Sequence, residues 1–338
     1  MNVFLFRPDY YAHYYNCSMF SAQEWDSFGT RRPYFGLSNV MIGTVVMILY
    51  VPCLKTMLEP ELFKHACYKL MFFNAVVDIF GVVNTCFITS FLAMEGTVFC
   101  TYPTFIYLWG TLGEALWQPQ CLGSVVLALS RCVNMWDCPF FNYFFRGKRV
   151  YGWWVLCIGY FVYSLFFCQA ALYSSAGNMW ALDPYFGIPN VTVDKSVYSS
   201  VLMDANNIFT FISLTTCYIF LVVSIWYKRK NNTVSGMNNM QRNVTIQAVL
   251  LCCFIYMCAM IYMCFEHFPT LLPPFSLVVT FYLWQWSFCG VVVIYMTMNK
   301  HLRDGVIKFY TCLPRHVVTS SAIYVTSSNM ANVNQPTM

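Results

Sequence analysis

Five long runs without a charged residue constrain the fold more than any other feature of this sequence. They are Phe35–Leu54, Tyr151–Tyr173, Ile208–Tyr227, Ala248–Phe265 and Phe275–Met298. A helix needs about 20 apolar residues to cross the hydrocarbon core of a bilayer, because lipid offers no hydrogen-bond partner to an unpaired backbone group. Each run has about this length, so we expect each to form a membrane-spanning helix.

Two further apolar runs each contain one acidic residue. Leu70–Leu92 carries Asp78, and Cys100–Leu129 carries Glu114. Charged residues make up only 10% of the chain, whereas about 25% is usual in soluble domains. We therefore predict an all-α membrane protein built as a bundle of seven transmembrane helices.

The basic residues are divided unevenly between the two sides of this predicted bundle. Of the 19 Lys and Arg residues, all but Arg7, Arg31, Arg32 and Lys195 fall on one side. Basic flanks are retained in the cytoplasm during insertion. We therefore predict that the N-terminus is outside and the C-terminus cytoplasmic.

This topology divides the chain into four parts. They are an extracellular N-terminal segment (1–34), the seven-transmembrane bundle (35–298), an amphipathic membrane-surface helix (299–313) and a disordered cytoplasmic tail (314–338). The surface helix is expected because Leu302, Val306 and Phe309 share one helical face, with most charges elsewhere. The tail is rich in Ser, Thr and Asn, which is typical of disorder.

Polar and aromatic residues within the spans are the candidates for ligand binding. A charge within hydrocarbon is costly, so Glu114 is expected to face the bundle interior. Gln118 and the helix-breaking Pro119 follow it, and a kink there would open space between helices. We assign the ligand pocket to Glu114, Gln118, Tyr262, Trp284 and Gln285. Ordinary packing against neighbouring helices is the alternative for all of them.

The cysteines and histidines argue against a metal site. The sequence has no C-x-x-C motif, its five histidines form no H-x-x-x-H pair, and no G-x-S-x-G motif is present. We therefore expect no metal, no cofactor and no enzymatic activity.

Two kinds of covalent modification are expected on the outer side. Cys17 and Cys100 could pair in an oxidising compartment, with Cys168 and Cys264 as competing partners. Glycosylation sequons begin at Asn16 and Asn190. Both sequons fall on the side that we predict to be extracellular.

The arrangement of spans and charges resembles a G-protein-coupled receptor. Arg131 closes the third span, the third inner loop is basic, and a surface helix follows the seventh span. Local motifs resemble the nematode serpentine chemoreceptors of class T over about residues 15 to 305. They are Tyr15-Asn16-Cys17-Ser18, Glu24-Trp25, Arg32-Pro33 with Gly36, Leu49-Tyr50-Val51-Pro52-Cys53-Leu54, Cys67-Tyr68-Lys69, Phe99-Cys100 with Pro103, Ser130-Arg131-Cys132, Asp183-Pro184, Trp284-Gln285, Ile294-Tyr295, and Asn299 with Leu302-Arg303.

This resemblance implies a chemosensory receptor that binds a small external chemical and activates a heterotrimeric G protein. It places the protein in the plasma membrane of sensory neurons or their cilia, with the lipid bilayer as a partner and no nucleic acid. The residues expected to contact the G protein are Arg131, Lys228, Arg229, Lys230 and Arg242. Asp78 and Tyr295 are expected to form a network between the pocket and the coupling face.

Alternatives to these assignments remain open at the level of sequence. Asp78 can be a static hydrogen-bonding site, and Arg131 can be a plain anchor on the cytoplasmic side. The chain also departs from many receptors, because Ser130 precedes the arginine where an acid is common and no proline lies between Phe275 and Leu313. A transporter or channel is the alternative function, although the internal repeats expected of such proteins are not evident.

Overall fold

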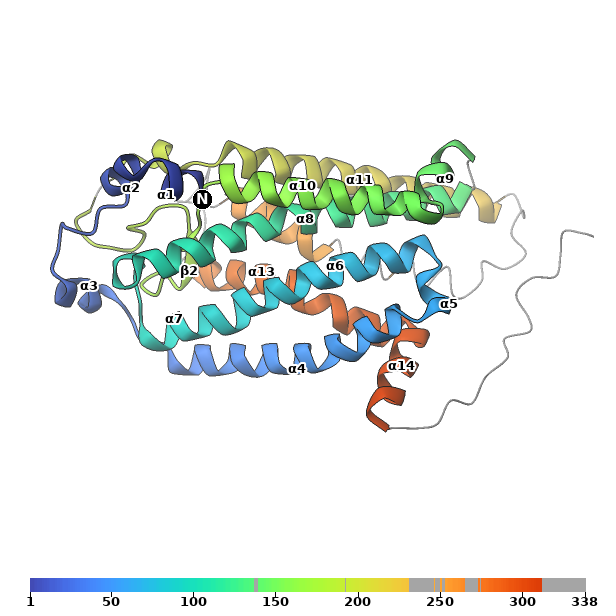
Figure 1. Cartoon of the computed structure of the whole chain (residues 1–338), viewed down its shortest axis with the longest axis horizontal. Helices are drawn as coiled ribbons and strands as arrows, with labels where there is room; N and C mark the ends of the chain where they lie inside the picture. Colours follow the sequence, from blue (N-terminus) through green and yellow to red (C-terminus); the bar gives the residue numbers. More distant parts are fainter. Residues whose placement is uncertain are drawn as a thin grey trace, which may run out of the picture.

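The computed structural model describes residues 1–136, 139–191, 193–230, 253–264 and 275–311, together with residues 246, 250 and 273. These parts of the chain are helical, apart from one small antiparallel sheet and the loops. The long helices run side by side along one axis (Figure 1).

Seven helical segments lie where the sequence predicts spans. They are α4 (Pro33–Met57), α6 (Ala66–Val82) continued by η1 (Val83–Ile88) and α7 (Thr89–Glu95), α8 (Pro103–Trp136), α10 (Val150–Phe167), α11 (Val201–Lys230), the helix Cys253–Cys264, and α13 (Phe275–Met298). Five of them are long and apolar enough to cross a membrane, namely all except α8 and Cys253–Cys264. The helix α8 is longer but more polar, with 34 residues. The predicted sixth span, Ala248–Phe265, lies partly outside the described residues.

The helix α8 is central in the bundle and packs against α6, α10 and α11. Glycines on α8 allow these close approaches. A Cβ atom on Gly123 would lie 2.2 Å from the side-chain oxygen of Asn74, which belongs to α6. By contrast, α10 buries only Val150, Cys157 and Ser164, as a helix in contact with lipid does, and Val155 is 70% exposed.

Short elements gather at the two ends of the bundle (Figure 1). At one end, which we call the hairpin end, lie α1 (Asn2–Phe6), α2 (Pro8–Tyr14), α3 (Ala22–Phe28), η2 (Phe99–Thr101), the hairpin β1 (Leu172–Ser174) and β2 (Met179–Ala181), and η4 (Lys195–Tyr198). At the opposite end, which we call the α14 end, lie α5 (Pro60–Phe63), α9 (Pro139–Phe145), η3 (Gly147–Arg149) and α14 (Lys300–Thr311).

Two of the span boundaries that differ from the sequence prediction have a clear structural cause. The fourth span was predicted to reach Tyr173, but α10 ends at Phe167 and Tyr173 lies in β1. Leu172 and Tyr173 of β1 are buried against the bundle. Because both are apolar, hydrophobicity alone extended the predicted fourth span too far. The fifth span begins at Val201, several residues before the predicted start, because the first turns of α11 carry polar residues that face the interior.

The second span contains a turn of π-helix. Along η1 the backbone bonds between residues five apart, and this wider turn is inserted between two α-helical stretches. The span nevertheless continues without a break from Ala66 to Glu95.

The segments outside the bundle can also be compared with the sequence prediction. The N-terminal segment is folded into three short helices, which the sequence did not predict. Near the other end of the chain, α14 buries Leu302 and Val306 against the bundle, while Phe309 is 39% exposed. The predicted tail 314–338 lies outside the described residues.

Candidate functional site

The β1–β2 hairpin covers the mouth of the bundle at the hairpin end. Trp180 of β2 donates a hydrogen bond from its indole nitrogen to the hydroxyl of Thr89, at 3.0 Å. The chain that enters the hairpin lies directly on α8, because a Cβ atom on Gly110 would lie 1.7 Å from the carbonyl oxygen of Ala171, just before β1. Ser175, in the turn, accepts a hydrogen bond from the backbone of Thr30 at 3.0 Å. The hairpin is thus fixed to both α8 and the N-terminal segment.

The residues Asn2–Tyr15, which we call the N-terminal cap, close the rest of this mouth with aromatic side chains. Phe4 stacks on Tyr107 of α8 at 5.5 Å, while Tyr11 and Tyr15 meet the same ring edge-on at 5.0 and 5.2 Å. Burial raises the pKa of Tyr11 to about 12 and raises that of Tyr15 as well. Both hydroxyls therefore stay neutral to a higher pH than the hydroxyl of an exposed tyrosine does.

A disulfide joins the segment that follows the N-terminal cap to η2, just before α8. Cys17 is bonded to Cys100, in η2, with their Cα atoms 5.5 Å apart. The alternative partner Cys168 is instead buried at the end of α10, where its thiol contacts the hydroxyl of Ser200 at 3.3 Å. The other competitor, Cys264, is a free cysteine.

Beneath the hairpin and cap lies a buried polar cluster around Glu114. Gln118, one helical turn further along α8, donates from Nε2 to Glu114 Oε1 at 3.3 Å. The thiol of Cys168 contacts the same oxygen at 3.6 Å. Gln118 is fully buried, and its Oε1 has no hydrogen-bond partner among the described residues. A buried acceptor without a partner is costly unless a ligand or water supplies a donor.

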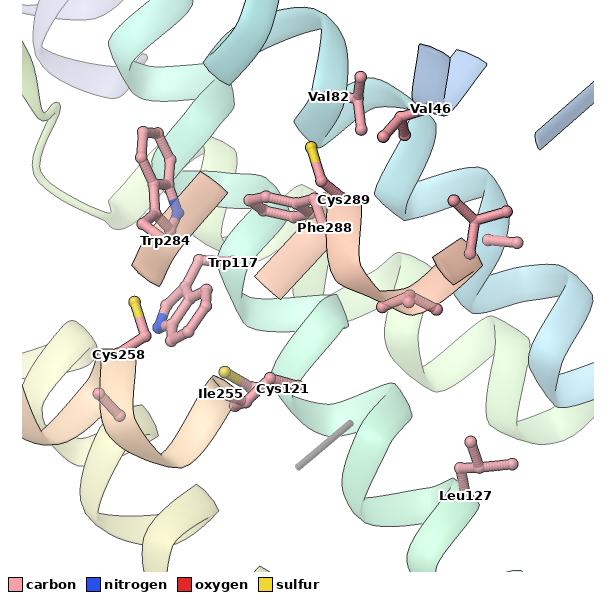
Figure 2. Packing of buried hydrophobic residues seen from close by; sticks show 14 of the residues in the cluster. Val46, Val82, Trp117, Cys121, Leu127, Ile255, Cys258, Trp284, Phe288 and Cys289 are labelled. Carbon is pink, nitrogen blue, oxygen red and sulfur yellow. The ribbon is translucent and has the colours of Figure 1, made fainter. Parts of the chain in front are cut away.

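Two tryptophans, Trp117 and Trp284, belong to the buried hydrophobic packing of the bundle interior (Figure 2). Trp117 of α8 donates from Nε1 to the side-chain oxygen of Asn207 on α11, at 2.8 Å. Trp284 of α13 contacts Trp180 of the hairpin, with ring centroids 6.5 Å apart. Trp284 also lies 3.5 Å from the position of a Cβ atom on Gly113, next to Glu114. Three of the five predicted pocket residues, Glu114, Gln118 and Trp284, therefore lie around one region of the interior, and Tyr262, on the helix Cys253–Cys264, packs against the buried core.

Gln285, the fifth predicted pocket residue, points elsewhere. Its Nε2 donates to the side-chain oxygen of Asn39 on α4 at 3.0 Å and contacts the Cys86 thiol at 3.2 Å. Successive residues of a helix point about 100° apart. Because Trp284 faces α8 and the hairpin, Gln285 faces α4 and the second span.

Asp78 links four helices by hydrogen bonds. Its Oδ2 accepts from the hydroxyl of Tyr50 on α4 at 3.1 Å, and its Oδ1 accepts from Gln120 Nε2 on α8 at 3.1 Å. The hydroxyl of Tyr50 also lies 2.9 Å from the carbonyl oxygen of Phe288, and Gln120 Nε2 lies 2.8 Å from that of Ser287. Both carbonyls belong to α13, so α4, α6, α8 and α13 meet at this carboxyl group.

A cavity of about 20 Å³ lies next to Asp78 on the side of the α14 end, and Tyr295 is among its lining residues. This volume accommodates about one water molecule and is too small for an organic ligand. The Tyr295 hydroxyl is buried without a hydrogen-bond partner in the described part of the chain. Asp78 and Tyr295, the two residues predicted to form a network, therefore line one cavity without a hydrogen bond between them.

At the α14 end, Arg131 is held by a cysteine rather than an acid. Its guanidinium donates from Nη2 to the thiol of Cys67, at the start of α6. Ser130, which stands where an acid is common, instead bonds its hydroxyl to the carbonyl oxygen of Leu127 at 2.7 Å. Arg131 Nε is buried without a partner among the residues described.

The other residues assigned to G-protein coupling are only partly described. Lys228 and Arg229 lie in the last turn of α11, and the ammonium group of Lys230 lies 5.2 Å from the Trp226 ring. Arg242 lies outside the described residues.

The two sequon asparagines both lie at the hairpin end. Asn16 is partly buried, and its side-chain oxygen accepts from the backbone of Ser18 at 2.8 Å. Asn190 is exposed and has a φ of 62°, a left-handed conformation that asparagine tolerates better than most residues.

Sequence reasoning missed the partners that give these residues their environment. Tyr50 and Gln120 donate hydrogen bonds to Asp78. Cys67 accepts one from Arg131, and Trp180 covers the site at the hairpin end. The one available signal was that a buried carboxylate needs donors from neighbouring helices. Which helices supply these donors depends on how the helices pack, and this packing cannot be read from a single sequence.

Comparison with known proteins gives a consistent result over nearly the whole chain. A family model described as "Serpentine type 7TM GPCR chemoreceptor Srt" matches residues 3–319. A curated relative is "Serpentine receptor class T-55" of Caenorhabditis elegans, 21% identical over 294 residues, which cover 86% of this chain and 78% of the relative.

A solved structure shares the fold. The crystal structure of squid rhodopsin superposes with a TM-score of 0.55 at 12% sequence identity, covering 88% of this chain and 92% of the rhodopsin chain. At this identity the likeness concerns the fold alone. It confirms the seven-transmembrane helix bundle that the apolar runs predicted.

Proposed function

Because this chain belongs to the serpentine chemoreceptors of class T, which are seven-transmembrane G-protein-coupled receptors, we propose that it binds an external chemical cue beneath the hairpin and activates a heterotrimeric G protein at the α14 end. The hairpin end then faces outside. The uneven distribution of basic residues supports this orientation.

One observation carries the proposal: α8 contributes residues both to the proposed ligand site and to the proposed site of G-protein coupling. Glu114 and Arg131 lie 17 positions apart on α8, which is about 25 Å along a helix. A ligand that contacts Glu114 or Gln118 would therefore act directly on the helix that presents Arg131. The Asp78 network lies between the two, so it would transmit a shift of α8 to α4, α6 and α13.

The cue itself is proposed to be small. The region around Glu114 combines one acid, neutral hydrogen-bonding groups and large aromatic rings, a composition typical of ligand sites. A ligand that stabilises one arrangement of the helices more than another would shift the balance between resting and signalling states. The proposed setting is the plasma membrane of sensory neurons or their cilia, and we propose no enzymatic activity.

The proposal is tested by measuring G-protein activation in cells that express the chain and are exposed to a broad chemical panel. We expect a ligand-dependent signal that Arg131→Ala abolishes at equal surface expression. Arg303→Ala is the matched control, because Arg303 is an exposed arginine on α14 at the same end. A ligand-driven ion or solute flux without G-protein activation would instead favour a transporter or channel.

A second variant tests how Arg131 is restrained. Cys67→Ala removes the thiol that holds the guanidinium, so we expect the ligand-independent signal to rise. Cys253→Ala is the control, because that cysteine is exposed on the helix Cys253–Cys264. If both variants show the same basal signal as the unmodified chain at equal surface expression, Cys67 does not restrain Arg131.

A further inference from the structure

The short helix α9 exposes an unusual number of aromatic side chains. Phe140, Phe141, Tyr143 and Phe144 are 67%, 53%, 53% and 44% exposed, respectively. Their rings contact one another, with Phe140 5.2 Å from Phe141 and 5.8 Å from Phe144 between centroids. They therefore form one continuous patch. An exposed apolar patch of this kind marks a surface that binds a protein or a membrane.

The position of α9 indicates a lipid partner. Its one buried aromatic residue, Phe145, stacks on Trp153 near the start of α10, at 5.6 Å and an interplanar angle of 17°. This α10 is the helix whose apolar side chains point outward, for example Val155 and Leu156. Figure 1 shows α9 beyond the end of α10, on the flank of the bundle. The patch thus continues the lipid-facing surface of α10.

Positive charges lie directly beside the aromatic patch. Lys148 and Arg149 follow α9 and are both exposed. The guanidinium carbon of Arg149 lies 3.4 Å from the centroid of the Tyr143 ring. Aromatic rings and basic side chains in combination favour the headgroup layer of a membrane, where the rings meet the acyl boundary and the cations meet phosphate.

We infer that α9 is a membrane-surface helix: its aromatic side chains insert into the headgroup layer, and Lys148 and Arg149 bind anionic phospholipid headgroups. A protein partner at the α14 end would approach along the bundle axis, toward Arg131. The helix α9 instead lies on the flank of the bundle, beyond the end of α10 (Figure 1). The inference does not depend on the ligand or on G-protein activation, so it can fail or succeed separately from the proposed function.

Photo-crosslinking of the full chain in nanodiscs tests this inference. A benzoyl-phenylalanine is placed at Phe141 or at Phe144, in discs of phosphatidylcholine with a minor fraction of phosphatidylserine. Val155 in α10 is the lipid-facing control, and Glu61, whose side chain is 84% exposed in α5, is the water-facing control. We expect lipid adducts at Phe141, Phe144 and Val155, and few at Glu61.

The charges are tested by the composition of those adducts. One cation near an anionic membrane surface favours binding about fivefold. The fraction of phosphatidylserine among the adducts at Phe141 should therefore exceed the fraction of phosphatidylserine in the disc several-fold. The double variant Lys148→Gln/Arg149→Gln should remove this excess, and Lys64→Gln, just after α5, should not. Two results would overturn the inference: no lipid adducts at Phe141 and Phe144 while Val155 forms them, or adducts that shift to an added G protein. An excess unchanged in the double variant would overturn the assignment of Lys148 and Arg149.

Discussion

Replacing Asp78 by asparagine should leave the bundle nearly as stable as the unmodified chain, although a buried acid is lost. The reason is the hydroxyl of Tyr50, which lies 3.1 Å from Asp78 Oδ2 and 2.9 Å from the carbonyl oxygen of Phe288. A hydroxyl can donate one hydrogen bond and accept others. In Asp78→Asn it can donate to Phe288 and accept from the new amide nitrogen. The amide oxygen can still accept from Gln120.

Asp78→Leu has a similar size but no acceptor, so it tests the same site without this rearrangement. Gln120 Nε2 would keep its bond to Ser287 and lose the one to Asp78. A buried donor without a partner costs about 1–3 kcal/mol. Tyr50→Phe leaves an acceptor without its donor and should cost about the same. The expected change for Asp78→Asn is below about 1 kcal/mol.

The assay is the thermal unfolding midpoint of the purified chain in nanodiscs, followed by near-ultraviolet circular dichroism. Asp78→Leu and Tyr50→Phe should lower the midpoint by several degrees, and Asp78→Asn by much less. Tyr34→Phe is the control for loss of a hydroxyl, because Tyr34 is 88% exposed. If Asp78→Asn is as destabilising as Asp78→Leu, the hydroxyl does not reverse its role and the reasoning is refuted.

Two further predictions concern the disulfide and the packing of glycines. Cys17→Ser and Cys100→Ser should each lower cell-surface expression, measured by surface labelling. The double variant should lose no more than either single variant, because all three remove the same bond. Additive losses in the double variant would contradict this prediction. Gly123→Ala should lower the unfolding midpoint, because its Cβ would lie 2.2 Å from the side-chain oxygen of Asn74. Gly159→Ala, whose Cβ would meet nothing within 4 Å, should be neutral or slightly stabilising; equal losses in the two variants would contradict the packing argument.

The fold could be predicted from the sequence because the solvent of this chain is lipid. Each span must satisfy its own backbone hydrogen bonds, so each appears as an apolar run that can be recognised alone. The same reasoning failed at Leu172 and Tyr173, which are apolar because they are buried under the mouth of the bundle. Hydrophobicity does not distinguish burial against protein from contact with lipid.

The candidate site could be predicted only in part. Glu114 and Gln118 are one turn apart on one helix, so the sequence alone places them together. Trp284 and Gln285 are adjacent in sequence, and for that reason point to different neighbours. The bond from Tyr50 to Asp78 joins residues on different helices. Such pairs depend on the rotation of each helix about its own axis, which residue types do not specify.

The π-helical turn η1 has a consequence for comparing this chain with its relatives. Because the turn holds one residue more than an α-helical turn, side chains beyond Ile88 are rotated relative to those before Val83. A relative with an uninterrupted α-helix would need a one-residue gap within Val83–Ile88. Without that gap, equivalent positions in α7 would be assigned one residue out of step, and Thr89, which binds Trp180, would be matched to a side chain on another face.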